Sequence, residues 1–373
     1  DIIFNWSYII PLTDSNIRAA VDNYINDIVT ARQRYGNIES WDTSNITDMS
    51  ELFMNGRNDI DTGNFNEDIS SWVTSSVTNM RKMFYNSGFG GDISEWDVSE
   101  LLWADLMFMK TTEFNTDISE WDVSNVKSMS LMFKESLKFN KSLSDWNMEC
   151  CTRMSEMFKS AKSFNGDIKN WTTSSVEYMN QMFMDACDFN QDISEWDVSS
   201  VISMEETFMS AIKFNNGGKP LSWTDTSEVK TMFKLFANCS NFNQDISNWN
   251  TEKVTSMQLM FDSASIFNQT VGSWDTQSLQ NIQGMFTNAK LFNNGDNPGE
   301  DNKSFGWDTD KIKGSLYKTF YNTHSFNQDI SSWNSGQITN MAFMFNNSLN
   351  FNTDLGQWDV RNVVNFQSMF DNA

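Results

Sequence analysis

The chain has 373 residues, of which 39% are hydrophobic and 14% aromatic, so it is long enough and apolar enough to bury a sizeable core. A formal net charge of −23 excludes the clustered basic surface that nucleic-acid binding requires, and it disfavours anionic membranes. No apolar run approaches the roughly 18 residues of a membrane-spanning helix, so we predict that this segment contacts neither nucleic acid nor membrane.

Residues 1–36 carry no repeat, but apolar residues recur among them at helical spacing. Asp14 or Ser15 is placed to cap the start of this helix, and Gly36 is placed to end it. We predict an N-terminal capping segment over residues 1–36, whose helix covers the exposed end of the domain that begins at residue 37. The periodic residues are Ile17, Val21, Tyr24, Ile28, Ala31 and Tyr35.

One motif then recurs about every 25 residues, most cleanly as F-N-x-D-I-S-x-W-D-V-S-x-V-x-x-M-x-x-M-F. A unit this small cannot bury its apolar face alone, so successive units must stack. We therefore predict one elongated repeat domain over residues 37–373. Thirteen tryptophans mark the copies, at positions 41, 72, 96, 121, 146, 171, 196, 223, 249, 274, 307, 333 and 358.

A single repeat reads as one strand and one helix. Asp117, Ile118 and Ser119 alternate polar and apolar side chains, as in a short strand with Ile pointing inward. The apolar residues after Trp121 step by three or four, which predicts an α-helix. Parallel strands joined by helical crossovers are almost always right-handed, so we predict a right-handed α/β solenoid of about thirteen repeats. The residues on the predicted helix face are Val126, Met129, Met132, Phe133 and Ser136.

Residues at equivalent positions of successive repeats form columns, and most of these columns are predicted to have a structural role. The Asn after each repeat Phe is predicted to form a ladder of stacked amides, because a buried polar side chain needs partners. The Trp, Phe and Met columns are predicted to fill the core.

An aspartate column precedes the tryptophans by three or four residues, next to the inward Ile. It is expected to face outward, where neighbouring carboxylates repel each other unless they are solvated or bind a cation. We predict solvated or backbone-bonded carboxylates, with weak Ca²⁺ binding as the alternative hypothesis; no other cofactor is predicted. The column is a candidate binding surface made of Asp68, Asp92, Asp117, Asp167, Asp192, Asp245, Asp329 and Asp354.

The period breaks at 55–63, 216–220 and 293–306, in stretches rich in Gly, Asn and Asp. Insertions in repeat proteins often carry recognition. The longest insertion supplies Asp296, Glu300 and Asp301 as loop candidates for binding, and Asn302 as a candidate for glycosylation.

The sequence contains few of the residues and motifs on which catalysis usually depends. His324 is the only histidine, and we find no phosphate-binding loop or zinc spacing. Four cysteines are too few for a disulfide framework, and we expect free, mostly buried thiols. Carboxylates that belong to repeat columns are poor candidates for a singular acid and base pair. We predict a non-enzymatic protein.

The repeat resembles that of the BspA-like leucine-rich repeat surface proteins, in the variant first catalogued as a mycoplasma lipoprotein repeat. The stretch from Phe189 to Ser199, F-N-Q-D-I-S-E-W-D-V-S, matches it almost residue for residue. The resemblance implies a leucine-rich-repeat-type solenoid displayed outside the cell and used for adhesion or partner binding. It carries over no catalytic residues.

These observations lead to two hypotheses about function. The first is an extracellular or surface-displayed module that binds a protein or glycan ligand. The alternative is a structural protein whose copies assemble through their repeats into a coat, filament or appendage on a cell or virion surface. Because the chain begins at Asp1 and ends soon after Phe370, we also expect it to be part of a longer or processed protein.

Overall fold

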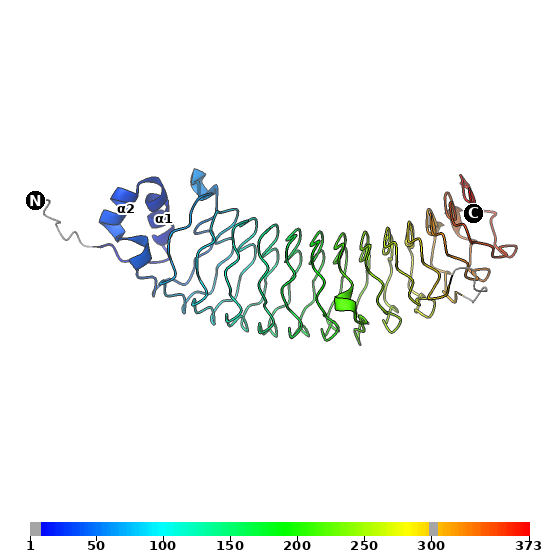
Figure 1. Cartoon of the computed structure of the whole chain (residues 1–373), viewed down its shortest axis with the longest axis horizontal. Helices are drawn as coiled ribbons and strands as arrows, with labels where there is room; N and C mark the ends of the chain where they lie inside the picture. The colour runs from blue at the N-terminus through cyan, green and yellow to red at the C-terminus, as the bar shows by residue number, and fades with distance from the viewer. Residues whose placement is uncertain (1–8, 298–304) are drawn as a thin grey trace, which may run out of the picture. The chain divides into compact units, whose positions relative to one another are not determined.

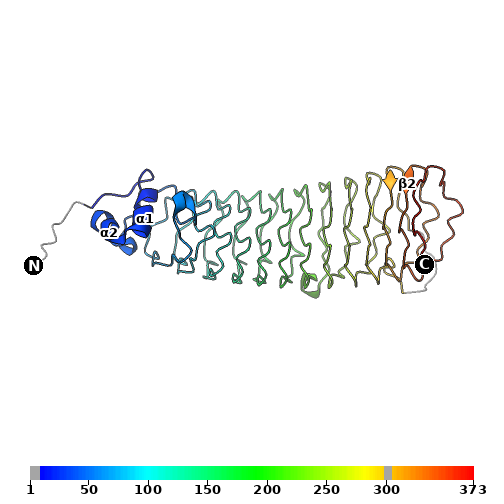
Figure 2. The same cartoon turned by 90° about the horizontal axis from the view of Figure 1, so that it is seen from above.

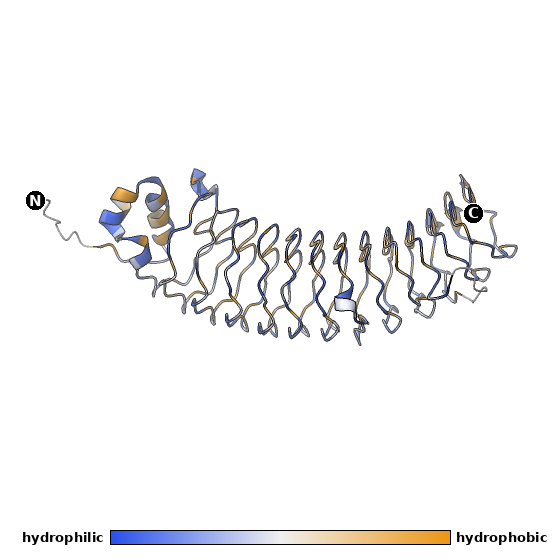
Figure 3. Ribbon diagram, viewed as in Figure 1, coloured by the Kyte–Doolittle hydropathy of each residue, from blue (hydrophilic) through white to orange (hydrophobic). Residues whose placement is uncertain are grey.

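The computed structural model describes residues 9–297 and 305–373, and the chain divides into two compact units, residues 1–175 and 176–373. In each unit one sequence repeat makes one coil, and successive coils lie side by side (Figures 1 and 2). Hydrophilic and hydrophobic residues alternate along each coil (Figure 3), because each coil presents one set of side chains inward and another outward. Both units are therefore repeat solenoids.

The N-terminal segment holds two helices rather than the single predicted one, α1 (Ile17–Asn26) and α2 (Ile28–Tyr35) (Figure 1). The break lies at Asp27, whose backbone leaves the helical region at φ −146° and ψ 81°. Its side chain accepts the Thr30 N–H and thereby caps α2. Gly36 ends α2 at φ 82°, which confirms the predicted stop.

The predicted start of the helix was wrong, because Asn16 is the N-terminal flanking residue of α1 and Asp14 has another role. The Asp14 carboxylate accepts the backbone N–H groups of Thr47 and Asp48 in the first coil, at 2.8 and 3.1 Å. On the same side, the Tyr24 ring meets Trp41 edge-on at 6.0 Å. The helices thus cover the first coil, as the sequence predicted.

The described repeats contain no α-helix, so the predicted strand-and-helix unit is corrected. Their regular elements are short: η1 (Ile38–Ser40), η2 (Arg57–Asp59), η3 (Asn216–Gly218), β1 (Gly314–Ser315) and β2 (Ile338–Asn340). Strands β1 and β2 pair in parallel on adjacent coils (Figure 2). The helical crossovers on which the right-handed prediction depended are therefore absent from the described coils.

The segment predicted as a helix is instead a run of tight turns. The N–H groups of Met132 and Ser136 each bond the carbonyl three residues earlier, at 3.2 and 3.0 Å. Leu131 and Glu135 adopt left-handed backbone conformations, with φ 60° and 59°, which prevents the chain from winding into a helix. All five residues of the predicted helix face are buried, so the predicted face was right and the backbone was wrong.

Between the turn bonds, alternate N–H groups donate to carbonyl groups of the next coil. We call this stretch of each coil the ladder segment; in the coil of Trp121 it covers residues 128–135. In unit 1 four donors bond four carbonyls of the following coil at 2.9 to 3.0 Å, whereas one bond, from the Thr152 N–H to the Lys127 carbonyl, runs the other way in these two described coils. Unit 2 repeats the pattern. The unit 1 pairs are Met129 to Arg153, Leu131 to Ser155, Phe133 to Met157 and Glu135 to Lys159.

This direction has an electrostatic consequence. Ordinary parallel strands exchange N–H and C=O groups in both directions, so their dipoles largely cancel. Here the peptide dipoles of the ladder point the same way from coil to coil, as they do in a helix. The first coil consequently turns a row of carbonyl oxygens toward the N-terminal segment, and those oxygens need donors.

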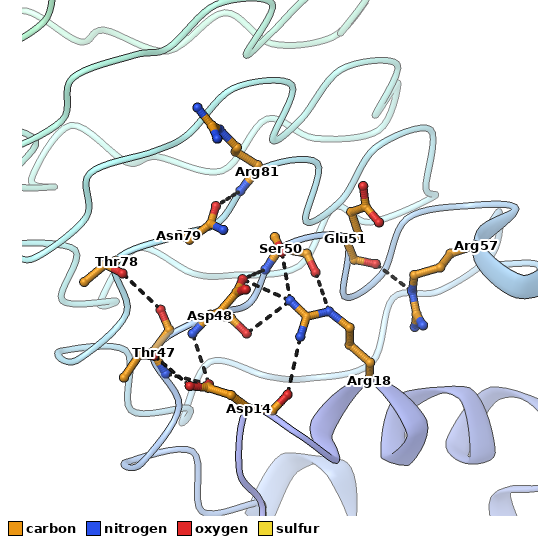
Figure 4. A network of polar contacts seen from close by, with 10 residues as sticks. All are labelled: Asp14, Arg18, Thr47, Asp48, Ser50, Glu51, Arg57, Thr78, Asn79 and Arg81. Atoms are coloured by element: carbon orange, nitrogen blue, oxygen red, sulfur yellow. Dashed lines mark hydrogen bonds and ion pairs between the residues drawn. The ribbon is translucent and has the colours of Figure 1, made fainter.

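Two arginines supply these donors, and Figure 4 shows the bonds of one of them, Arg18, to Asp48 and Ser50. Arg18 donates to the carbonyls of Asp48 and Ser50, at 3.5 and 3.0 Å. Arg57 donates its Nη2 to the Leu52 carbonyl at 3.1 Å and its backbone N–H to the Met54 carbonyl at 3.3 Å. We call Arg18 and Arg57 the arginine cap. The first interruption of the period, which contains Arg57, is therefore part of this cap.

The aromatic columns form the core, as predicted. Phe108 stacks on Phe133 with ring centres 5.6 Å apart and planes within 8°, and other Phe pairs in both units repeat this spacing. Most tryptophans of the column also donate a hydrogen bond from the indole nitrogen. The Trp121 Nε1 donates to the carbonyl of Ile93 in the preceding coil at 3.1 Å. The indole N–H is thereby satisfied inside an apolar layer.

The asparagine column forms the predicted ladder. In unit 1 the Asn115 side-chain oxygen accepts the Asn140 N–H at 3.0 Å, and in unit 2 Asn243 accepts from Asn268 at 2.8 Å. Each amide therefore replaces one inter-coil backbone acceptor.

Candidate functional site

The outward side chains of the ladder segments differ from coil to coil, unlike the repeated Trp, Phe and Asn columns. We call the surface that they form the ladder face. In unit 1 the positions that pair across neighbouring coils are Asp48, Asn79, Trp103, Ser128 and Arg153. At many of these positions the side chain accepts the backbone N–H two residues later, as Asp48 and Asn79 do for Ser50 and Arg81, whereas Trp103 has no such acceptor and departs from this pattern.

A groove of about 450 Å³ lies on the ladder face of unit 1. It combines aromatic, charged, hydroxyl and amide side chains, which is the mixture found in small-ligand sites. It is lined by Ser50, Glu51, Asn79, Arg81, Lys82, Trp103, Asp105, Leu106, Ser128, Ser130, Leu131 and Arg153.

Asp105 is the buried charge at the base of this groove, with only 12% of its side chain exposed. Its carboxylate accepts from Arg81 Nε at 2.8 Å, from the Ser130 N–H at 3.2 Å and from the Ser128 hydroxyl. A buried carboxylate is stable only with such partners. Asp105 therefore holds Arg81 in place.

Arg81 is held on a second side by Trp103. The guanidinium carbon lies 4.5 Å from the centre of the Trp103 ring, within cation–π distance. Of the three guanidinium nitrogens only Nε has a hydrogen-bond partner among the described residues, while 46% of the side chain stays exposed. In Figure 4 the guanidinium points away from the arginine cap. Both terminal nitrogens are thus available to a ligand.

The ladder face of unit 2 carries a different cluster. The Lys318 ammonium lies over the rings of Tyr317, Tyr321 and Phe343, at 5.3, 4.8 and 5.8 Å from their centres. These residues are partly exposed. A separate hollow of about 650 Å³ in the same unit is polar, and it is lined by Gln280, Asn281, Gln283, Lys311 and Lys313.

The predicted aspartate column lies elsewhere, in the turns before the tryptophans. In each of its eight members the carboxylate accepts the backbone N–H two residues later; the Asp68 bond to the Ser70 N–H is 3.0 Å long. These bonds are typical of an Asx turn and agree with the predicted backbone-bonded role.

The local hydrogen bonds also change the acidity of part of this column. Hydrogen bonds from Ser70 and Ser94 lower the pKa values of Asp68 and Asp92. For Asp192, burial raises the pKa, but bonds from Ser194 and Lys219 outweigh it and bring the pKa to about 2.

Of the three loop candidates for binding, only Asp296 lies within the described residues. Asp296 is 8% exposed, and its side chain accepts from Gln328 Nε2 at 3.1 Å, so it is part of the internal bonding of the insertion. Glu300, Asp301 and the glycosylation candidate Asn302 lie outside the described residues.

Other chemistry-bearing residues are scattered. In the described ranges no three His, Cys, Asp or Glu side chains gather where they could hold a metal ion, and the Ca²⁺ hypothesis stays a prediction. All four cysteines are free, and burial raises the pKa of Cys151 to about 12. His324 bonds the Asn322 side chain at 2.7 Å. No helix within the described residues has the length and apolarity to cross a bilayer.

Sequence reasoning missed the groove because its residues belong to no column. One signal was available, since Trp103 stands outside the thirteen regularly spaced tryptophans. The pairing of Trp103 with Arg81 and Asp105 could not be read from the chain, because it depends on which positions of the ladder segment point outward.

Comparison with known proteins assigns the repeats to a family. No curated protein sequence matches the chain. One solved structure, titled "Crystal structure of TLR13-ssRNA13 complex", aligns with 83% of this chain at 9% identity and a TM-score of 0.21, which is too loose to inform the fold or function. The chain spans 45% of the length of that protein. A family model matches residues 23–146, 105–223, 217–301 and 296–373, so the chain belongs to the family described as "Mycoplasma protein of unknown function, DUF285".

Proposed function

We propose that this chain is a non-enzymatic repeat protein displayed outside the cell, which binds a protein or glycan ligand through its ladder face. The observation that carries the proposal is the contrast between repeated and individual positions. Trp, Phe, Asn and Asp recur in columns with structural partners, whereas the side chains of the groove in unit 1 and the three rings around Lys318 in unit 2 vary from coil to coil. Repeated columns build a scaffold, and singular surface residues provide recognition.

Display outside the cell is supported by the resemblance to BspA-like surface proteins. The large negative charge also suits a displayed repeat protein, because like charges on its surface oppose aggregation. The non-enzymatic role is supported by the aspartate column, whose carboxylates are engaged by their own turns.

The alternative is a structural protein that assembles through its repeats. The arginine cap weighs against stacking at the N-terminal end, because a second copy would have to displace Arg18 and Arg57 from the first-coil carbonyls. Assembly at micromolar concentration would show as polymers in size-exclusion chromatography with light scattering. A monomer is the result expected for a binding module.

A panel of immobilised glycans and extracellular matrix proteins tests the proposal directly. Trp103→Ala and Lys318→Ala change the ladder face of the two units, while Lys253→Ala removes an exposed charge, paired with Glu228, elsewhere on unit 2. Binding that is lost with either ladder-face variant and kept by Lys253→Ala supports the proposal. Binding that none of the ladder-face changes affects contradicts it.

A further inference from the structure

The groove on the ladder face of unit 1 is locally basic in an acidic chain. Its lining contains Arg81, Lys82 and Arg153 against Glu51 and Asp105, so positive side chains outnumber negative ones by one. Lys82 pairs with Glu51 and Arg81 with Asp105, so the lining as a whole tolerates a negative group on a ligand. Most of the acidic surface would repel such a ligand, which makes this exception informative.

The geometry of Arg81 favours a carboxylate as that group. The guanidinium is fixed by Asp105 on its Nε and by Trp103 against its face, and its terminal nitrogens have no partner among the described residues. A planar fork held in this way matches the two oxygens of a carboxylate, and little conformational entropy is lost on binding.

The rest of the lining suits a sugar ring. The Asn79 amide nitrogen and the Ser130 hydroxyl have no hydrogen-bond partner among the described residues, so they can bond ring hydroxyls. Trp103, Leu106 and Leu131 are partly exposed and offer apolar surface to the C–H groups of a ring. The groove thus offers an ionic, a polar and an apolar contact within one small volume.

An extended acidic peptide fits less well. Peptides commonly bind by adding a strand to a free sheet edge. In the described coils beneath this groove the ladder N–H groups already donate to the next coil, as Ala104 does to Ser128 and Leu106 to Ser130 at 3.1 and 3.0 Å. No strand edge is therefore open inside the groove.

We propose that this groove binds an acidic glycan, one carboxylate of a uronic acid pairing with Arg81 and its ring resting beside Trp103. This inference rests on the proposed role of the ladder face in ligand binding. It adds the substrate class and the recognising residue.

The test is isothermal titration calorimetry of the whole chain with a hexamer of 1,4-linked galacturonic acid, in EDTA so that calcium cannot bridge the partners. The fully methyl-esterified hexamer has the same backbone without charge and is the matched ligand control. Binding of the free acid that weakens with added salt and is absent for the ester is the expected result.

Variants then locate the site. Arg81→Lys keeps the charge beside Asp105 but loses the fork, and is expected to weaken binding about tenfold. Asn79→Asp keeps the side-chain oxygen that accepts the backbone N–H of Arg81 while adding a negative charge, and should also weaken binding. Lys138→Ala removes an exposed positive charge outside the groove and should leave the affinity within about twofold of the original. Thermal unfolding confirms that each variant is folded.

The proposal is overturned if the free acid gives no heat, if the ester binds equally well, or if a hexaglutamate peptide binds as tightly as the sugar acid. It is also overturned if folded Arg81→Lys and Asn79→Asp both bind normally. If the acid hexamer fails while ladder-face variants abolish binding of another ligand from the panel, this inference alone is wrong. If no ligand depends on the ladder face, the proposed function fails as well.

Discussion

Replacing Arg57 by Ala tests whether the aligned ladder needs its cap. The Arg57 side chain is 10% exposed, and its Nε and Nη2 donate to the carbonyls of Glu51 and Leu52 at 2.9 and 3.1 Å. Its Nη1 donates to Asp22 at 3.1 Å. The change leaves the Leu52 carbonyl without a donor and takes one of two donors from the Glu51 carbonyl, which keeps the Met54 N–H. It also leaves a carboxylate, 22% exposed, without its cation.

Removing one partner of a buried ion pair costs about 3 to 5 kcal/mol, and the partial exposure of Asp22 favours the lower end. A loss of about 3 kcal/mol corresponds to an increase of about 150-fold in the opening equilibrium of the first coils. Asp22→Asn is the matched control, because it removes the negative charge and leaves the two carbonyl bonds of Arg57 in place. It should cost clearly less.

Hydrogen exchange measured by mass spectrometry on peptides from residues 41–60 reports this local opening without requiring the whole chain to unfold in one step. Faster exchange confined to the first coils in Arg57→Ala, with a smaller change in Asp22→Asn, is expected. Equal effects of the two variants would show that the ion pair alone matters and would refute the reasoning about the carbonyl row.

Three further predictions concern unit 2. The folded-state pKa of Asp192 is about 2, below its ordinary 3.8, so its contribution to stability is complete above that ordinary value and is lost as pH falls toward 2. Asp192→Asn should cost about 2 kcal/mol at pH 7 in urea unfolding and flatten the acid limb of the stability profile. Burial raises the pKa of Asp262 despite nearby Ser, Asn and Lys groups, so its charged form opposes folding at neutral pH. Asp262→Asn should therefore raise the melting temperature at pH 7, and the gain should disappear in acid. Asn243→Ala removes the acceptor of the Asn268 N–H and should cost about 1 to 2 kcal/mol in the same urea assay, while Asn243→Asp, which keeps an acceptor oxygen, should cost less.

The sequence predicted the repeat core well but misjudged the backbone that presents it. Burial of Val126, Met129 and Met132 followed from their spacing, because inward positions three residues apart satisfy a chain of turns as well as a helix. The difference lies in Leu131 and Glu135, which have φ near 60°. A left-handed backbone conformation is unfavourable for residues other than Gly, and here the hydrogen bonds to the next coil offset that cost. The sequence of a single repeat does not indicate those bonds.

The candidate site was harder to predict than the core. The Asp column attracted attention because repetition is visible in a sequence, yet its carboxylates are used by their own turns. Arg81 and Asp105 escaped notice because they lie 24 residues apart and meet only when two coils stack. Recognition residues on a repeat scaffold are irregular by nature, so a search for regularity passes over them.

The same backbone ladder explains why this fold can separate stability from recognition. Most inter-coil hydrogen bonds of the ladder use main-chain groups, and the Trp, Phe and Asn columns fill the interior, so outward side chains such as Trp103 contribute neither to the ladder nor to the core. A substitution there changes the chemistry of the surface with little effect on the stack. Trp103 and Lys318 occupy such positions in different units. Trp103 contacts the Arg81 guanidinium, and Lys318 contacts the Tyr321 ring. Function is therefore expected where the repeat is least regular, at outward side chains held by a regular backbone.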